Sequence, residues 1–363
     1  MSSAKISNWT SYRFDDKNSG FVDSDTIVKT LHLKWKFQVV NEIHSSPLIH
    51  NGIAYVGCWG HIFYAIDIET RKVKWKFNTG FFISDSAFIN DSFIILPSGL
   101  NLYFLDHNGN ELFKYTIDEE DIFMGITSSP IVNNGVVYFC SFWFLYAVKI
   151  DTLELIWKFE SPLNDTFSSN TFNSTPIISN DIIYVTSNIY LYALNAITGE
   201  IIYKFKTNHY IDNSPAIKDD KIFFGGVDRI MYCLEKSTGL IYWKFNADSS
   251  INTAPAIDET TIFFGCQDGT FYSLNILTGK LNWKFKTEDG INSSPIVYGE
   301  SVFFGSDKIY GLNKNTGSEF WNFSSKRGKE RGFVANPVVI DDMLFIGGMD
   351  NQFYAFNIEN HNL

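Results

Sequence analysis

Three aspartates at matching positions of an internal repeat are the residues best suited to metal chemistry in this chain. Asp228, Asp268 and Asp350 share one repeat position, and Asp307 is displaced from it by one residue. Carboxylates gathered around an axis can hold a hard cation such as Ca²⁺. Asp also caps backbone N–H groups in turns, and this turn chemistry is the preferred interpretation. The three aspartates are therefore candidate metal ligands, and no metal is assigned to them.

Two tryptophans, Trp59 and Trp143, lie inside the repeats but outside the repeated pattern. The flat face of an indole can stack on a planar ligand such as a quinone, which makes both residues candidates for cofactor binding. The alternative is an aromatic side chain packed at the base of a loop.

Two charged segments interrupt the repeat. An acidic run contains Asp118, Glu119, Glu120 and Asp121, and the one basic cluster contains Lys326, Arg327, Lys329 and Arg331. Both occupy the connection from the last strand of one unit to the first strand of the next, so they should emerge on one face. Loops on a rigid scaffold often carry binding residues, and such patches attract a partner of complementary charge. They are candidate partner-binding segments, with solvated loops as the alternative.

Recognisable catalytic patterns are absent from the sequence. Cys58, Cys140, Cys233 and Cys266 are far apart and form no CxxC pair, which predicts unpaired thiols. The seven histidines show no HExxH spacing, and neither a phosphate-binding glycine loop nor a Gly-x-Ser-x-Gly elbow occurs. The sequence therefore favours a protein without enzymatic activity.

Composition narrows the partners and the compartment. With 29 basic and 40 acidic side chains, the formal net charge is −11, which argues against a nucleic-acid-binding protein. No stretch approaches the roughly 18 apolar residues that span a bilayer. Residues 1–20 lack the apolar core of a secretory signal. Together with the unpaired thiols, these features predict an intracellular and cytoplasmic protein without a membrane span.

A repeat of about 40 residues organises the chain. Its clearest marker is Trp-Lys-Phe, with degenerate copies that begin at Phe113, Tyr203 and Trp321. A proline follows this position in seven copies, at a spacing of twelve residues in the first of them (Trp35 to Pro47). All eight copies carry a tyrosine, and four carry a Thr-Gly turn before the next tryptophan position. The structural tryptophans of the repeat are Trp35, Trp75, Trp157, Trp243, Trp283 and Trp321.

Each unit reads as four short strands bounded by turn residues, which predicts an all-β, eight-bladed β-propeller of four-stranded antiparallel blades. The last unit lacks its tryptophan strand, and the first tryptophan strand has no unit of its own. Residues 31–37 are therefore expected to pair with the last blade and close the ring. The predicted organisation is a lead-in segment at 1–30, one propeller at 31–358 and a tail at 359–363, with the tryptophans between neighbouring blades.

The pattern Ala65-x-Asp67-x-x-Thr70-Arg71-x-x-x-Trp75 resembles the tryptophan-docking repeat of pyrroloquinoline quinone (PQQ) propellers. The segment 8–20 is similar to the one that precedes the first blade in that family, and the resemblance covers roughly residues 8–358. The family includes quinoprotein dehydrogenases and BamB-type outer-membrane assembly lipoproteins. A quinoprotein would carry adjacent cysteines, a calcium set and a tryptophan floor. This chain has no adjacent cysteines and is shorter than such enzymes.

The preferred functional hypothesis is a non-catalytic scaffold that binds protein partners through its loop face, with no cofactor. One alternative is a quinone- or small-ligand-binding propeller, for which the resemblance implies PQQ with calcium. Another is a structural subunit that assembles with itself or with other proteins.

Overall fold

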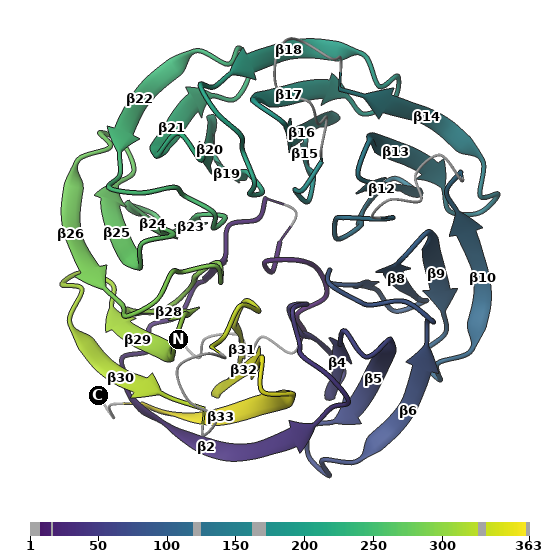
Figure 1. Ribbon diagram of the computed structural model, residues 1–363, viewed down its shortest axis with the longest axis horizontal. Helices are drawn as coiled ribbons and strands as arrows, with labels where there is room; N and C mark the ends of the chain where they lie inside the picture. Colours follow the sequence, from purple (N-terminus) through teal and green to yellow (C-terminus); the bar gives the residue numbers. More distant parts are fainter. Residues whose placement is uncertain (1–7, 16, 119–124, 162–171, 326–331, 361–363) are drawn as a thin grey trace.

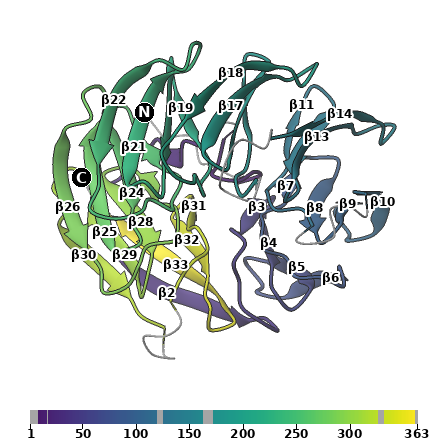
Figure 2. The same ribbon diagram turned by 45° about the horizontal axis from the view of Figure 1, so that its top comes forward.

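The computed structural model describes residues 8–15, 17–118, 125–161, 172–325 and 332–360. Its regular elements are strands, numbered β1 to β33, and they form eight sheets arranged as a ring. Figure 1 looks down the ring axis, and Figure 2 shows the same ring tilted, with the blades standing around a common centre. This confirms the predicted eight-bladed propeller. The described ranges contain no helix long and apolar enough to cross a membrane.

The first four blades follow one another along the chain with the same strand order, from the innermost to the outermost strand. They consist of β3 (Leu48–His50), β4 (Ile53–Gly57), β5 (Ile62–Asp67) and β6 (Val73–Asn78); β7 (Phe88–Ile89), β8 (Ile94–Ser98), β9 (Asn101–Leu105) and β10 (Glu111–Thr116); β11 (Ile131–Asn133), β12 (Val136–Cys140), β13 (Phe144–Lys149) and β14 (Leu155–Glu160); and β15 (Ile177–Ser179), β16 (Ile182–Ser187), β17 (Tyr190–Asn195) and β18 (Ile201–Lys206).

The remaining blades repeat this order, with two additions from the N-terminal part of the chain. They consist of β19 (Ala216–Lys218), β20 (Lys221–Gly225), β21 (Ile230–Glu235) and β22 (Ile241–Asn246); β23 (Ala256–Ile257), β24 (Thr261–Gly265), β25 (Thr270–Asn275) and β26 (Leu281–Lys286); β27 (Ile296–Tyr298), β28 (Ser301–Gly305), β29 (Ile309–Asn313), β30 (Glu319–Phe323) and the added β1 (Phe21–Val22); and β31 (Val338–Ile340), β32 (Met343–Gly347), β33 (Gln352–Asn360) and β2 (Val28–Gln38).

The ring closes through β2, which pairs antiparallel with β33 and serves as the outermost strand of blade 8. Trp35 lies opposite Ala355 in this pair, and Leu31 lies opposite Ile358. A strand from the N-terminal part of the chain and one from the C-terminal part therefore share one sheet, as the repeat predicted. Closing the ring in this way leaves no blade without neighbours and removes open sheet edges at the chain ends.

The outermost strands bind each blade to the next through the tryptophan and phenylalanine of the repeat. In blade 5, the Trp243 indole N–H donates to the Ile276 carbonyl of blade 6 at 3.0 Å. Phe245, two residues later, meets Tyr272 of blade 6 edge-on with ring centroids 5.5 Å apart. The lysine between them, Lys244, is exposed because successive strand residues point to opposite sides.

The Thr-Gly turn of the next blade requires glycine at its second position, because the tryptophan ring of the preceding blade packs against it. Gly279 has φ +66°, and a Cβ there would lie 2.6 Å from the Trp243 ring. At the seam between blades 8 and 1, Arg71 replaces this glycine, and the buried indole N–H of Trp35 has no partner among the described residues. The seam geometry therefore depends on the turn residue of the following blade.

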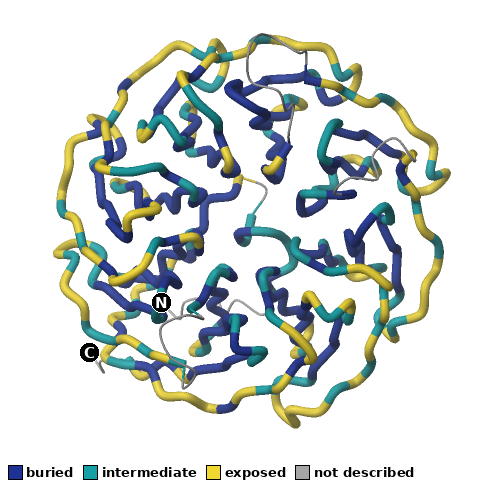
Figure 3. The backbone as a smooth tube through the Cα atoms, viewed as in Figure 1, coloured by how far each residue is buried: buried dark blue, intermediate teal, exposed yellow. Residues whose placement is uncertain are grey.

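Burial decreases from the centre of the disk to its rim. Figure 3 shows mostly buried inner strands and outer strands whose residues alternate between partly covered and exposed. The outer strands β14, β18 and β26 share one pattern of two exposed residues followed by strict alternation. The rim and the two faces of the disk therefore carry the surfaces open to partners.

Candidate functional site

The N-terminal segment runs through the centre of the ring instead of leaving it open (Figure 1). On one side, Trp9 forms an antiparallel bridge with Ile49 of β3. On the other side, the Gly20 carbonyl accepts a hydrogen bond from Val297 N of β27 at 2.8 Å. Further backbone bonds link Thr10 to Ile89, Lys17 to Ile217 and Ser19 to Ile257. The segment therefore ties together the innermost strands of blades 1, 2, 5, 6 and 7.

Arg13 anchors this segment inside the channel. Its side chain is buried, with Nη2 donating to the Pro255 carbonyl at 2.8 Å and Nε donating to the Asn18 carbonyl at 3.3 Å. Burial lowers the pKa of Arg13 to about 10. Gly20 has φ +57°, and a Cβ there would lie 2.2 Å from Arg13 Nη2, so the close approach of guanidinium and backbone requires glycine.

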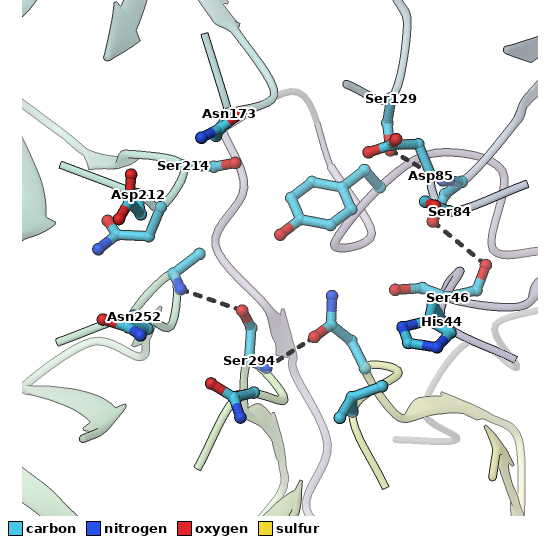
Figure 4. A pocket seen from close by; sticks show the side chains of 17 residues that line it. His44, Ser46, Ser84, Asp85, Ser129, Asn173, Asp212, Ser214, Asn252 and Ser294 are labelled. Atoms are coloured by element: carbon cyan, nitrogen blue, oxygen red, sulfur yellow. Dashed lines mark hydrogen bonds between the residues drawn. The ribbon is translucent and has the colours of Figure 1, made fainter. Parts of the chain in front are cut away.

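A polar basin of about 180 Å³ lies at the channel mouth, against Tyr12 of this segment (Figure 4). Its wall comes from a four-residue stretch of each blade, which ends at the repeat proline or, in blade 2, at Ala87. The residue that begins the stretch lines the basin at the following positions: His44, Ser84, Asn173, Asp212, Asn252, Asn292 and Val334. The sequence analysis did not single out this ring, although its signal is present: the residues three positions before the repeat proline are mostly small and polar.

Hydrogen bonds between neighbouring blades hold the wall of the basin. The amide of the third residue in one stretch donates to the side chain of the third residue in the next, for example Ser86 N to Ser129 Oγ at 3.0 Å. The same bond recurs from Ser129 to Thr175, from Thr175 to Ser214, from Ala254 to Ser294 and from Ser294 to Asn336. Ala254 interrupts the belt because it offers no side-chain oxygen to the amide of Ser214.

The basin favours neutral or cationic groups over anions. Burial raises the pKa of Asp85 to about 7, and loss of solvent also raises the pKa of Asp212. Burial lowers the pKa of His44, which favours its neutral form. Neither Lys nor Arg is among the described residues that line the basin. A ligand with several carboxylates would therefore find no cation to pair with among these lining residues.

Trp59 lies beside the basin within an exposed aromatic cluster. Its ring stacks on His44 with centroids 3.9 Å apart and an interplanar angle of 7°. Its indole N–H donates to Ser84 Oγ at 3.1 Å, and the ring tilts against Phe82 at 5.9 Å. Phe81 packs on Phe82 at 4.2 Å. Trp59 and Phe81 are 40% and 39% exposed, so two large rings are held in place at the surface.

Trp143 lies in the connection between β12 and β13 and is partly buried. It meets Phe142 edge-on at 4.8 Å. The structure does not bring Trp143 and Trp59 to one site, because they belong to blades 3 and 1 and each packs against its own neighbours.

The three repeat aspartates each bind groups of their own blade. Asp228 accepts a hydrogen bond from the Tyr232 hydroxyl at 2.6 Å, and Asp350 accepts one from Tyr354 at 2.5 Å. Asp268 accepts a hydrogen bond from Thr270 N at 3.0 Å and pairs with Lys286 at 3.0 Å. Within the described ranges, no three His, Cys, Asp or Glu side chains gather in a way that could hold a metal ion.

The charged loops are described only in part. Asp118 forms an ion pair with Lys158 at 3.6 Å. Glu119, Glu120 and Asp121, together with Lys326, Arg327, Lys329 and Arg331, lie outside the described residues. The four cysteines are unpaired and buried, and burial raises the pKa of Cys58, Cys140, Cys233 and Cys266.

Similar structures include two dehydrogenases and a BamB protein. A quinohemoprotein alcohol dehydrogenase from Comamonas testosteroni aligns with TM-score 0.81 at 13% identity, over 98% of this chain and 81% of that chain. BamB from Moraxella catarrhalis aligns with TM-score 0.76 at 13% identity, over 90% of this chain and 100% of that chain. A europium-containing methanol dehydrogenase aligns with TM-score 0.80 at 12% identity, over 97% and 98%. At these identities the likeness shows the fold alone.

A comparison with curated protein sequences finds no match. A sequence model of the family described as outer membrane protein assembly factor BamB matches residues 28–205 and 190–363. The two matches together extend from the ring-closing strand β2 to the end of the chain. The chain therefore belongs to the BamB-like family of PQQ-type β-propellers.

Proposed function

We propose that this propeller is a non-catalytic scaffold that binds a protein partner through the face carrying the channel mouth. The observation that carries the proposal is the aromatic cluster of Trp59, Phe81 and Phe82 beside the basin, in which Trp59 and Phe81 are exposed. Aromatic side chains that are already ordered dominate the binding energy of many interfaces, because little side-chain entropy is lost on docking. Stacking on His44 and the hydrogen bond to Ser84 provide this order for Trp59.

Three further features support the scaffold role. The N-terminal segment and the belt of inter-blade hydrogen bonds stiffen the loops that present the cluster. Val40, 60% exposed, extends the apolar surface toward blade 8. The family model that the chain matches bears the description of an outer membrane protein assembly factor. Assembly of other proteins requires contact with them as partners.

The residues at the channel mouth do not fit PQQ. The quinone carries three carboxylates, whereas the basin presents Asp85 and Asp212 without a lining cation. One face of the Trp59 ring is already covered by His44. The basin volume of about 180 Å³ is also below the roughly 300 Å³ of typical small-molecule pockets. Calorimetric titration with PQQ and calcium chloride is expected to give no binding heat, and saturable binding would overturn this reasoning.

Affinity purification from the source cells tests the scaffold proposal. Tagged wild-type protein, W59A/F81A and the control L112A are compared by quantitative mass spectrometry. Leu112 is exposed on the outermost strand of blade 2, away from the channel mouth. A partner is expected with the wild type and L112A, and its yield should fall at least about ten-fold with W59A/F81A.

Equal melting temperatures of the three proteins are required for this comparison, because they show that the cluster variants are folded. If W59A/F81A melts lower, W59F/F81L replaces it, since this pair keeps more of the packing. Equal partner yields from the wild type and a folded cluster variant would refute the proposal.

A further inference from the structure

A cavity of about 680 Å³ lies at the seam between blades 8 and 1, where the ring closes. Figure 1 shows these two blades side by side, with β31 to β33 and β2 next to β4, β5 and β6. Gly52 of the β3–β4 turn and Glu69 of the β5–β6 turn border the cavity. Both turns lie at the opposite end of the blade from the β4–β5 connection, which carries Trp59. The cavity is therefore separate from the channel mouth and from the proposed function.

The corresponding space at the seam between blades 1 and 2 is much smaller, at about 260 Å³. Its lining residues Tyr55 and His107 are the repeat equivalents of Phe345 and Ile68, which line the larger cavity. His107 stacks on His50 of blade 1, with ring centroids 5.2 Å apart. This pair of imidazoles fills the inner part of the seam.

Lysine occupies the repeat position of this histidine in blades 5 and 7, and it crosses both seams. Lys236 Nζ donates to Ser179 Oγ of blade 4 at 3.1 Å, and Lys314 Nζ lies 3.4 Å from Asp258 Oδ2 of blade 6. Each partner stands three positions after the repeat proline of the preceding blade, as does the partner of the stacked histidine. Side chains at these two repeat positions therefore span three different seams.

At the ring-closing seam the same two positions carry Ile68 and Ile340, and neither side chain has a polar group that could span the gap. Phe345 also lacks the hydroxyl with which its equivalents Tyr138 and Tyr184 donate to the turn of the next blade, at 3.2 Å and 3.1 Å. This seam thus lacks contacts that other copies of the repeat make, and a cavity takes their place.

The cavity has recessed apolar walls and a polar inner end. Ile49, Ile340 and Phe345 of its walls are only 1%, 6% and 1% exposed, so they form no protruding surface. Asp341 directly follows the innermost strand β31, and its buried Oδ1 has no hydrogen-bond partner among the described residues. An unpaired buried acceptor is costly, and a donor on a ligand would satisfy it. The volume lies within the roughly 300–1,000 Å³ of small-molecule sites.

Net charge does not select the ligand, because both signs border the cavity. Lys34 lies at its outer end, on β2. Asp67 pairs there with Lys74 at 3.9 Å. Glu69 and Arg71 are exposed on the adjoining turn. Since these charges offset one another, a neutral molecule meets the smallest electrostatic cost on entering the cavity.

We propose that this cavity binds a neutral, mainly apolar small molecule that carries a hydroxyl or an amide N–H at one end. The apolar body covers Ile68, Ile340 and Phe345, and the donor bonds to Asp341 Oδ1. A ligand in this place also joins blades 8 and 1, which the side chains of this seam do not span, so its binding stabilises the closed ring.

Equilibrium dialysis with two matched probes at neutral pH tests the proposal. 2-Naphthol has an apolar bicyclic body and one hydroxyl donor, and 2-methoxynaphthalene has the same body without the donor. The wild type is expected to bind 2-naphthol saturably and 2-methoxynaphthalene at least about five-fold more weakly. Ile68→Lys copies the lysine of blades 5 and 7 into the cavity and should weaken 2-naphthol binding at least about ten-fold.

Two further variants control for charge and for folding. Ile197→Lys makes the same change of charge on an exposed turn outside the cavity, and it should leave 2-naphthol binding unchanged. Met343→Trp fills the cavity without a change of charge and should also weaken binding about ten-fold, which keeps the test decisive if Ile68→Lys does not fold. Binding that the folded filled variants retain, equal affinity for the two probes, or no saturable binding of 2-naphthol would overturn the proposal.

A crystal structure of the protein with 2-naphthol locates the probe. Density for the probe between Ile68 and Ile340 would support the proposal. Density for the probe at another place, or for residues 1–7 of the chain inside the cavity, would overturn it. The scaffold proposal fails separately, through W59A/F81A.

Discussion

Replacing two repeat tryptophans by phenylalanine should have different effects on stability, although both are buried at blade seams. The indole N–H of Trp243 donates to the Ile276 carbonyl, whereas that of Trp35 has no partner among the described residues. Phe113 occupies the same repeat position in blade 2, so the blade architecture tolerates phenylalanine there. The comparison of W243F with W35F therefore isolates one inter-blade hydrogen bond.

The expected difference is about 2–4 kcal/mol. Each substitution removes about 40 Å³, which at about 24 cal/mol per Å³ costs about 1 kcal/mol. W243F also leaves the buried Ile276 carbonyl without this donor, at about 1–3 kcal/mol. W35F instead removes an unpaired buried N–H, which offsets about 1 kcal/mol of its own loss. W243F should therefore destabilise by about 2–4 kcal/mol, and W35F by close to zero.

Differential scanning calorimetry measures this difference. With an unfolding entropy of about 2.1 cal/mol/K per residue over 363 residues, 1 kcal/mol corresponds to about 1.3 °C. W243F is therefore expected to melt about 3–5 °C below W35F. Equal losses in both variants would refute the view that the indole hydrogen bond, and not ring volume alone, connects the blades.

Three further changes test other contacts. Gly279→Ala should destabilise the protein by about 2–3 kcal/mol, which is more than Gly135→Ala. Both glycines have positive φ, but only a Cβ at position 279 would meet a tryptophan ring. The melting temperatures of the two variants test this difference. Because burial raises the pKa of Asp85 to about 7 from 3.8, its contribution to stability is full below pH 3.8 and lost as pH rises through 7. D85N should therefore melt above the wild type at pH 8, with the gap closing toward pH 4. Arg13→Met leaves the Pro255 carbonyl without its donor and should speed proteolysis of the N-terminal segment at least several-fold, as gel electrophoresis of timed digests would show, and an unchanged rate would contradict the anchoring role.

The fold could be predicted from the sequence because the repeat supplies eight copies of one pattern. Strand boundaries, blade order and ring closure all follow from markers whose physical roles recur. Trp243 and Phe245 point to the next blade, Gly279 admits the ring, and the proline opens the inner strand. A single blade would have left most of these assignments open.

The site was less predictable because it depends on departures from the pattern and on chain segments far apart in sequence. Nothing local to Arg13 indicates that it lies against Pro255, which is 242 residues away. The stacking of Trp59 on His44 likewise depends on two side chains that the repeat pattern does not specify. Asp85 looks like an ordinary loop residue until the ring places it in a recessed polar basin.

Repetition also gives each surface residue its own internal control. When most blades accept a polar residue at a rim position and neighbouring blades do not, the difference cannot come from the shared fold. The pair Ile201–Ile202 against Val73–Lys74 is one such difference between copies. Ala254, in a belt that otherwise carries polar side chains, is another, at the centre of the ring. In a propeller of one repeated unit, function should therefore be sought where the copies disagree. By this criterion the channel mouth beside Trp59 is the surface on which a partner should be sought first.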